Sequence, residues 1–255
     1  MRATIGGFDG VHLAHQELIK RADLVIIIEK GSSLTPGFDR VYYFDKAFEY
    51  LKLEEIKQKS ADEFMEYLKS LNIKKIIVGE DFRFGKKREG DLKLLQKRFK
   101  VEVIKEIKKD NIPIHSKVIR ELIKKNKIKK ANSLLGRPYK IKGTKIKGQG
   151  LGSRELLPTI NIELIKPYTL PKGVFITKTN SSPSLTFIGK RSTDDNFSIE
   201  THILTPFKEK KLIEIKFIEF LRENKKFDNI HDLKEAILKD IQTAKKYFKE
   251  NYGTN

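Results

Sequence analysis

The first half of the sequence alternates short apolar runs with amphipathic helical patterns, and this alternation constrains the fold more than any other feature. The apolar runs lie at residues 3–5 (ATI), 22–28 (ADLVIII), 74–79 (KKIIVG) and 100–104 (KVEVI). Such runs are typical of strands buried on both faces, and the helical patterns between them favour parallel pairing through crossover connections. Residues 1–135 are therefore predicted to form a doubly wound parallel sheet of the α/β class.

The helical patterns of this half carry recognisable ends. Ser60 precedes one of them and Glu63 follows three residues later, which is the pattern of a capping box. Its apolar residues share one helical face and are Phe64, Tyr67, Leu68 and Leu71. Two further helices are predicted over residues 116–125 and 128–135, and Gly136 is suited to ending the second.

The pattern changes at Gly136. From Tyr139 to about Phe220, short runs with alternating polarity are separated by Gly, Pro, Ser and Asn, which indicates a small antiparallel β barrel, with a sandwich as the alternative. A final helix begins near Asp232 and has one apolar face, formed by Leu233, Ala236, Ile237, Ile241, Ala244 and Phe248. The sequence therefore predicts two domains, 1–135 and 136–255, of which the second is a β barrel with a C-terminal helix.

Composition narrows the classes of function. The chain contains no cysteine, which excludes disulfides and thiolate metal sites, and no apolar run is long enough to span a membrane. Its formal net charge of +19 comes mostly from lysines spread along both halves. Because the charge is not gathered in a tail or patch, a solvated surface is favoured over a nucleic-acid interface. A cytoplasmic protein is expected.

The stretch TIGGFDGVHLAHQELI, residues 4–19, joins the first predicted strand to the first helix. In open parallel sheets ligands bind at this position, and the start of a helix presents free N–H groups to an anion. Three glycines, Gly6, Gly7 and Gly10, permit positive φ and a close approach of the backbone. His12 and His15, three residues apart, project from one side of the first turn. Phosphate binding is favoured over surface decoration, and zinc is disfavoured because no third ligand is near.

These residues resemble the signature of the bacterial bifunctional riboflavin kinase/FAD synthetases, a branch of the HxGH nucleotidyltransferases. Further blocks resemble the same family in the same order, namely VGEDFRFGKKREGD (78–91), IRELIKKNKIKKANSLLGRPY (119–139), GLGSRELLPTINIEL (150–164) and FSIETHIL (197–204). The resemblance implies two reactions, phosphorylation of riboflavin by ATP to FMN and adenylylation of FMN by ATP to FAD and pyrophosphate. Both use Mg²⁺. The adenylyltransferase is expected in residues 1–135 and the kinase in residues 136–255.

In the first domain, the resemblance implies that His12 and His15 are catalytic. Residues expected to bind ATP or its phosphates are Gly6, Gly7, Phe8, Asp9, Gly10, Ser116 and Arg120. Residues expected to bind the flavin are Asp81, Phe82, Arg83 and Phe84. Taken by themselves, these residues leave alternatives open. Asp9 is also suited to capping the helix, Phe82 and Phe84 are suited to the core, and Asp81 and Arg83 are suited to a solvent-exposed surface.

In the second domain, Glu200 is expected to act as the general base, with a salt bridge to a lysine as the alternative. On the strand FSIETHIL, alternation predicts an apolar face with Phe197, Ile199 and Ile203 and places Glu200 and His202 on the other face. Thr159 and Asn161 present oxygens suited to Mg²⁺. The phosphate loop is expected at Gly148, Gly150 and Gly152, whose alternative is a simple hairpin turn. The two remaining histidines, His115 and His231, are expected on the surface.

The sequence also departs from the family pattern. Ala14 replaces the glycine of HxGH, and Lys117 and Val118 replace a threonine and an arginine in a segment that contacts ATP in relatives. The loop at residues 29–40 replaces an aromatic and proline-containing loop, and Leu157 replaces a phenylalanine. Two other functions therefore stay open: a riboflavin kinase without adenylyltransferase activity, and a basic nucleic-acid-binding protein on the same scaffold. The expected partners are flavins and ATP, without nucleic acid or membrane, and the expected state is a monomer or weak oligomer.

Overall fold

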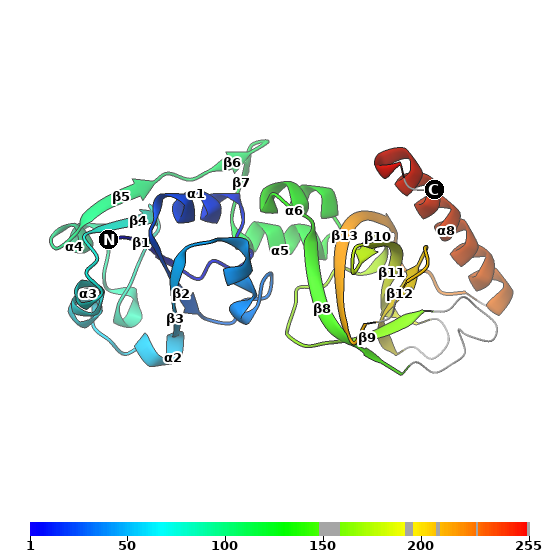
Figure 1. Cartoon of the computed structure of the whole chain (residues 1–255), viewed down its shortest axis with the longest axis horizontal. Helices are drawn as coiled ribbons and strands as arrows, with labels where there is room; N and C mark the ends of the chain where they lie inside the picture. The colour runs from blue at the N-terminus through cyan, green and yellow to red at the C-terminus, as the bar shows by residue number, and fades with distance from the viewer. Residues whose placement is uncertain (148–158, 192–195, 208–209, 228, 254–255) are drawn as a thin grey trace. The chain divides into compact units, whose positions relative to one another are not determined.

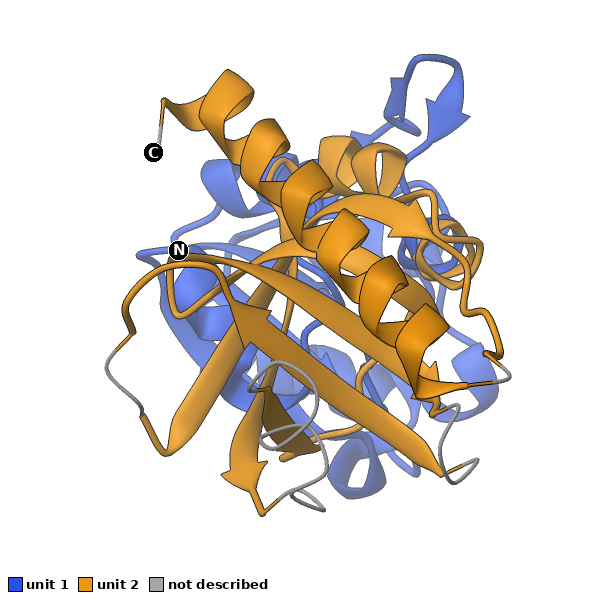
Figure 2. Ribbon diagram, turned by 90° about the vertical axis from the view of Figure 1, so that its right-hand side faces the viewer, with its two compact units in different colours: residues 1–119 blue, residues 120–255 orange. Residues whose placement is uncertain are grey.

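The computed structural model describes residues 1–147, 159–191, 196–207, 210–227 and 229–253. The chain divides into two compact units, Met1–Ile119 and Arg120–Asn255 (Figure 2). The division between units lies before the change in sequence pattern at Gly136, because the helix over Ile128–Leu135 packs on strands of the second unit.

The first unit is built on a five-stranded parallel sheet with the strand order β3-β2-β1-β4-β5 (Figure 1). The strands are β1 (Arg2–Gly6), β2 (Leu24–Glu29), β3 (Ala47–Lys52), β4 (Lys75–Gly79) and β5 (Lys100–Ile104). The predicted doubly wound α/β class is confirmed. Sequence analysis missed β3, because this edge strand has no buried residue and so lacks the apolar run that marks the others.

Helices and short turns connect these strands. They are α1 (Leu13–Arg21), the 3₁₀ turn η1 (Gly37–Tyr43), α2 (Leu53–Ile56), α3 (Ala61–Ser70), η2 (Lys86–Arg88) and α4 (Leu92–Gln96). After β5 come the hairpin of β6 (Lys108–Lys109) and β7 (Ile112–Pro113), and then α5 (Ser116–Lys124). The predicted capping box is present: the Ser60 hydroxyl accepts from the Glu63 backbone N–H at 3.2 Å, and a Glu63 carboxylate oxygen accepts from the Ser60 N–H at 2.6 Å.

The sequence of strand β2 is continuously apolar because the strand is buried on both faces. Leu24 and Ile26 face a core shared with α3 and α4, whereas Val25 and Ile27 face a second core shared with α1. Alternate residues of a strand point to opposite faces, so a strand covered on both faces needs apolar residues throughout. The two cores fix the sheet between its helices and thereby hold the carboxyl ends of the strands in place.

The second unit is a closed six-stranded antiparallel barrel with the strand order β10-β11-β12-β9-β8-β13. Its strands are β8 (Tyr139–Ile146), β9 (Ile160–Leu164), β10 (Gly173–Thr179), β11 (Ser182–Lys190), β12 (Phe197–Ile203) and β13 (Leu212–Arg222). The barrel is confirmed, and the sandwich alternative was wrong. Among the described residues, α6 (Ile128–Leu135) and the C-terminal α8 (Ile230–Tyr252) lie wholly in this unit. Helix α8 lies across the barrel in Figure 2 and buries Ile241, Ala244 and Phe248.

The barrel interior contains a cluster of hydroxyl groups as well as apolar side chains. Five side chains of β10, β11 and β12 are completely buried and hydrogen-bonded to one another: Thr177, Thr179, Ser184, Thr186 and Thr201. Thr201 faces inward together with Ile199, so the face of β12 that carries Glu200 faces outward. The prediction that Phe197 belongs to the apolar face was wrong: it lies at the first residue of the strand and is 53% exposed.

We expect the substitution Thr186→Val to destabilise the barrel by roughly 1–3 kcal/mol, because valine keeps the shape but removes the hydrogen bonds that Thr186 makes to Thr177 and Thr201 within the buried hydroxyl cluster. The Thr186 hydroxyl lies 2.8 Å from that of Thr177 and 3.1 Å from that of Thr201. Scanning calorimetry measures the change. The matched control is Thr243→Val on the exposed face of α8, and an equal effect of both substitutions would contradict the prediction.

Candidate functional site

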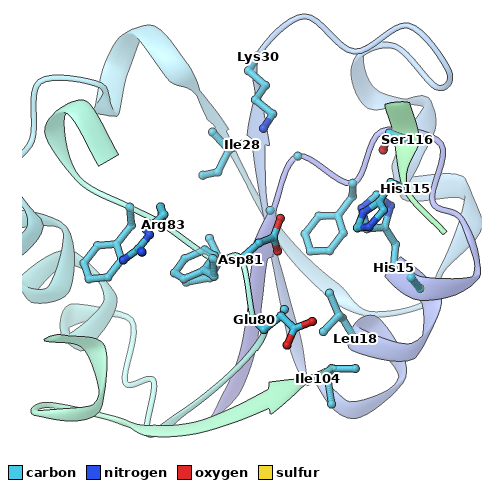
Figure 3. Close-up of a pocket in the computed structure, with 18 of the residues that line it drawn as sticks. His15, Leu18, Ile28, Lys30, Glu80, Asp81, Arg83, Ile104, His115 and Ser116 are labelled. Carbon is cyan, nitrogen blue, oxygen red and sulfur yellow. The ribbon is translucent and has the colours of Figure 1, made fainter. Parts of the chain in front are cut away.

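A cavity of about 790 Å³ opens in the first unit at the carboxyl ends of its parallel strands (Figure 3). Its walls come from the residues that follow the strands: Gly6 and Gly7 at the end of β1, Lys30 after β2, Asp81 after β4 and Lys105 after β5. The start of α5 and the first turn of α1 complete it. Ligands of open α/β sheets bind in this position, so the cavity is the candidate site of the unit.

Two stacked imidazoles line the cavity at the start of α1. The rings of His12 and His15 are nearly parallel, with centroids 3.5 Å apart, and the ring of Phe8 meets His15 edge-on at 5.2 Å. His12 is the N-cap of the helix, because its Nδ1 accepts a hydrogen bond from the His15 backbone N–H at 3.3 Å. With Nδ1 acting as acceptor, the proton of a neutral His12 ring is carried by Nε2.

Asp9 does not cap the helix, and that alternative was wrong. Its side chain is buried, and Oδ1 accepts hydrogen bonds from the backbone N–H groups of Leu34 and Thr35 at 2.8 and 3.0 Å. The Asp9 carbonyl accepts from the Ser116 hydroxyl at 2.8 Å. Asp9 therefore ties the loop after β2 and the start of α5 to the turn after β1, and among the described residues neither Asp9 nor Gly10 lines the cavity.

Arg40, which was not predicted from the sequence, also holds the turn after β1, on the side opposite the cavity lining. Its side chain is fully buried, donates hydrogen bonds to the carbonyls of Gly7 and Gly37, and pairs with the Glu29 carboxylate. The Tyr50 hydroxyl donates to the same carboxylate at 2.8 Å. Burial, followed by the hydrogen bond to Glu29, raises the pKa of Tyr50 to about 12, so the phenol stays a donor. No local pattern marks Arg40, because Gly7 and Glu29 lie 33 and 11 residues away in the sequence.

The backbone of the turn is unusual at several positions. Gly10 has φ +86°, as sequence analysis allowed, but Phe8 and Val11 also have positive φ, at +47° and +38°. Gly6 and Gly7 do not have positive φ, so what a glycine provides at these positions is the space that a side chain would otherwise occupy. A Cβ at Gly7 would lie 3.0 Å from Cε of Lys30, which reaches toward the cavity in Figure 3. A positive φ is energetically unfavourable for a residue other than glycine, and such residues are concentrated in functional turns.

His15 is held as a neutral imidazole. Burial lowers its pKa well below the usual value of 6.5, and the charges of His12 and then His115 lower it further. Its Nδ1 is buried and has no hydrogen-bond partner in the part of the chain that the structure describes. A neutral ring with an unsatisfied buried nitrogen is a group prepared for a ligand.

The four residues predicted to bind flavin, Asp81, Phe82, Arg83 and Phe84, all line the cavity after β4. The rings of Phe82 and Phe84 stack at 5.8 Å, and Phe84 is buried in the core against α3. Phe84 thus serves the core, whereas Phe82 is only partly buried. Arg83 forms an ion pair with Asp91 at 3.4 Å.

The segment that begins α5 contributes differently from its prediction. Ser116 lines the cavity, and so does His115, which was expected on the surface. Arg120 belongs to the second compact unit, Lys117 is exposed, and among the described residues neither lines this cavity. Sequence analysis missed His115 because a histidine before a helix carries no pattern that distinguishes it from a surface residue.

The second unit places Glu200 and Asn161 directly opposite each other on the paired strands β12 and β9. Side chains of such a pair lie on the same face of the sheet. Glu200 is 20% exposed, and its Oε1 is buried 3.6 Å from Nη1 of Arg191, without a hydrogen bond from the residues that the structure describes. The nearby cation is thus an arginine and not the lysine of the alternative reading. Thr159 is exposed just before β9. Gly148, Gly150, Gly152 and Leu157 lie outside the described residues.

Comparison with known proteins matches both units. The family model described as riboflavin kinase matches residues 135–248, and the one described as FAD synthetase matches residues 36–129. Curated relatives carry the name bifunctional riboflavin kinase/FMN adenylyltransferase. The chain is 33% identical to the one from Buchnera aphidicola subsp. Schizaphis graminum and 32% identical to the one from Haemophilus influenzae. Each alignment covers 96% of this chain and 93% of the relative.

A solved structure, titled as that of a macrolide-efflux protein from Streptococcus pneumoniae, has a TM-score of 0.82 and covers 96% of this chain and 93% of its own. At 22% sequence identity, this likeness shows the fold alone. Among the described residues, no helix is both long and apolar enough to cross a membrane.

We expect His15 to resist protonation. Because its folded-state pKa is lower than the unfolded value of about 6.5, the folded protein binds fewer protons there and loses stability as the pH falls through 6.5. Histidine NMR titration, assigned with His15→Gln, should show the His15 ring neutral at pH 6, where an ordinary histidine is mostly protonated. A His15 midpoint at or above 6.5 would contradict this prediction.

Proposed function

The chain belongs to the family of bifunctional riboflavin kinase/FMN adenylyltransferases, and we propose which of its residues carry out each of the two reactions. It phosphorylates riboflavin with ATP to give FMN, and it transfers the adenylyl group of a second ATP to FMN to give FAD and pyrophosphate. The proposed functional domains are residues 1–135 for adenylyl transfer and residues 136–255 for phosphorylation. The matched regions, 36–129 and 135–248, support this assignment.

Adenylyl transfer is assigned to the cavity of the first unit. The FMN phosphate attacks the α-phosphorus of ATP in line with the departing pyrophosphate, and the reaction needs positioning and neutralisation of charge, without a covalent intermediate. His12 and His15 are the proposed catalytic residues. The single observation that carries this assignment is the stacked imidazole pair at the first turn of α1, with the His12 Nε2–H as donor to a phosphoryl oxygen.

The turn after β1 is proposed to hold the phosphates. Gly6 and Gly7 allow them close to the backbone, and Phe8, Asp9 and Gly10 complete the turn. Asp9 acts by tying the turn to its neighbouring loop, since its carboxylate is already engaged by backbone N–H groups. Ser116 and Arg120 are the further residues proposed to contact ATP.

The flavin is proposed to lie on the side of the cavity that follows β4. Phe82 offers a partly exposed ring for stacking, supported from below by Phe84 in the core. Asp81 is an acceptor suited to the N–H edge of the isoalloxazine ring, and Arg83 is a cation suited to the FMN phosphate. In this arrangement the ring of Phe82 and the histidine pair lie on opposite sides of the cavity, and the FMN phosphate that attacks ATP lies between them.

Riboflavin phosphorylation is assigned to the outer face of the barrel, with Glu200 as general base. Its carboxylate removes the proton of the terminal ribityl hydroxyl as that oxygen attacks the γ-phosphorus of ATP, and ADP leaves. Oε1 of Glu200 supports this role, since it is a buried acceptor to which none of the described residues donates a hydrogen bond. The predicted phosphate loop at Gly148, Gly150 and Gly152 remains part of the proposal.

Magnesium is proposed as the cation of both reactions, and in the kinase unit the donor groups suit it. Thr159 and Asn161 supply neutral oxygens, and Asn161 lies opposite Glu200 in the sheet. Among the described residues, no group of three or more His, Asp or Glu side chains forms a metal site, which fits an ion that shares its coordination with phosphates and water. When bound, Mg²⁺ neutralises phosphate charge.

We further propose that flavins and ATP are the only partners the chain requires, without nucleic acid or membrane. The spread of its lysines over both units supports this. We propose a cytoplasmic enzyme that is a monomer or weak oligomer.

We expect Glu200→Gln to slow FMN formation by about 10²–10⁴-fold, the usual contribution of a general base. FAD formation from supplied FMN should stay unchanged, because His12 and His15 lie in another unit. Chromatography of the flavins after incubation with ATP and Mg²⁺ measures both. The matched control is Glu163→Gln, an exposed carboxylate on β9, and equal loss of both activities in Glu200→Gln would contradict the assignment.

We expect the reverse pattern for His12→Asn. Asparagine still caps the helix but removes the Nε2–H donor, so FAD formation should fall by about 10²-fold or more while FMN formation continues. The matched control is His231→Asn, since His231 is 77% exposed in the other unit. If His12→Asn forms FAD at the original rate, the cavity is not the adenylyl transfer site.

A further inference from the structure

His115 stands at the cavity wall immediately before α5, where the sequence alone predicted a surface residue. Its Nε2 lies 3.0 Å from Oε1 of Glu106, and about half of its side chain is exposed to the cavity and solvent. A carboxylate accepts and never donates when ionised, so Nε2 carries a hydrogen and Nδ1 is the atom left for a ligand.

The charges around His115 come from several elements. Glu106 is also paired with Lys108 of β6 at 3.3 Å, and its backbone N–H donates to the Glu80 carboxylate. Hydrogen bonds from His115 and then from Lys108 lower the pKa of Glu106, so this carboxylate is ionised and its charge is compensated. His12 and His15 face His115 from α1, and Lys105 lines the same cavity.

The two ends of the cavity differ in character. Figure 3 shows Arg83 on one side of Asp81, and His15 with His115 on the other. The aromatic residues Phe82 and Phe84 adjoin Arg83 in sequence, and both line the cavity. In-line attack places the nucleophile and the leaving group on opposite sides of the α-phosphorus. With the flavin at the aromatic end, the leaving pyrophosphate is at the histidine end.

We propose that His115 is a further phosphate-binding residue of the adenylyltransferase, which contacts the departing pyrophosphate of ATP through Nδ1 while Glu106 orients the ring. The bound polyphosphate stabilises the imidazolium form, whose two N–H groups then point to Glu106 and to a phosphate oxygen. This inference rests on the proposed assignment of the cavity to adenylyl transfer. Lys117, which replaces a threonine of the family pattern in this segment, is exposed and does not line the described cavity wall.

The test compares steady-state constants of the full chain for FAD formation from FMN. We expect His115→Ala to raise the KM for ATP and the inhibition constant of pyrophosphate each by about tenfold, the range of one hydrogen bond to a charged group. The KM for FMN should change by less than about twofold, because the flavin lies at the other end of the cavity. His115→Lys, which restores a cation, should return both raised constants to within about threefold of the original.

The matched control is Lys117→Ala, which removes a neighbouring cation that faces solvent and should leave all three constants unchanged. The thermal unfolding curve of each variant, compared with that of the original protein, reports whether the first unit is folded. An unchanged KM for ATP in His115→Ala, a larger effect on FMN than on ATP, or an equal effect of Lys117→Ala would each overturn the inference. Failure of the cavity assignment is distinguished by His12→Asn, which retains FAD formation only in that case.

Discussion

A guanidinium group without access to water is tolerated only where its charge and its N–H groups are matched, and Arg40 meets that condition at the back of the phosphate turn. Its partners are the Glu29 carboxylate at the end of β2 and the carbonyls of Gly7 and Gly37. Loss of the arginine would remove the charged partner of Glu29 and the donor to the Gly7 carbonyl. The positive φ values of Phe8 and Val11 persist because this network and Asp9 fix the turn on both sides.

The two candidate sites are positioned by different physical means. In the first unit, side chains from four strand ends and two helix starts converge because parallel strands all end at one edge of the sheet. In the second, Glu200 and Asn161 meet because of antiparallel register, and a slip of one residue would turn Glu200 into the barrel interior. The buried hydroxyl cluster around Thr186 opposes such a slip, since each hydroxyl is satisfied only in this register.

Features carried by local periodicity could be predicted from the sequence, and features carried by distant contacts could not. The parallel sheet, the capping box at Ser60 and the barrel follow from apolar spacing and turn residues. Strand β3 escaped because an edge strand needs no buried run. Arg40 and Gly7 are 33 residues apart, so no short window of the sequence contains both partners. His115 and Glu106 are nearer in sequence, but they meet because the β6–β7 hairpin between them turns the chain back. Asp9 was misassigned because the competing cap, His12, is an uncommon N-cap residue.

The position of His115 also bears on the departures from the family pattern. Val118 and Lys117 replace an arginine and a threonine of the signature, which by itself indicates a weaker hold on ATP. A helix presents successive residues about 100° apart, so residues 115 and 117 cannot face one cavity in the same way. The side chain that faces the wall is that of His115, one residue before the helix begins, with Ser116 beside it. In the proposed arrangement His115 reaches the polyphosphate and no cation is required at position 117, because the effect of a side chain depends on where it lies and not on its place in a signature.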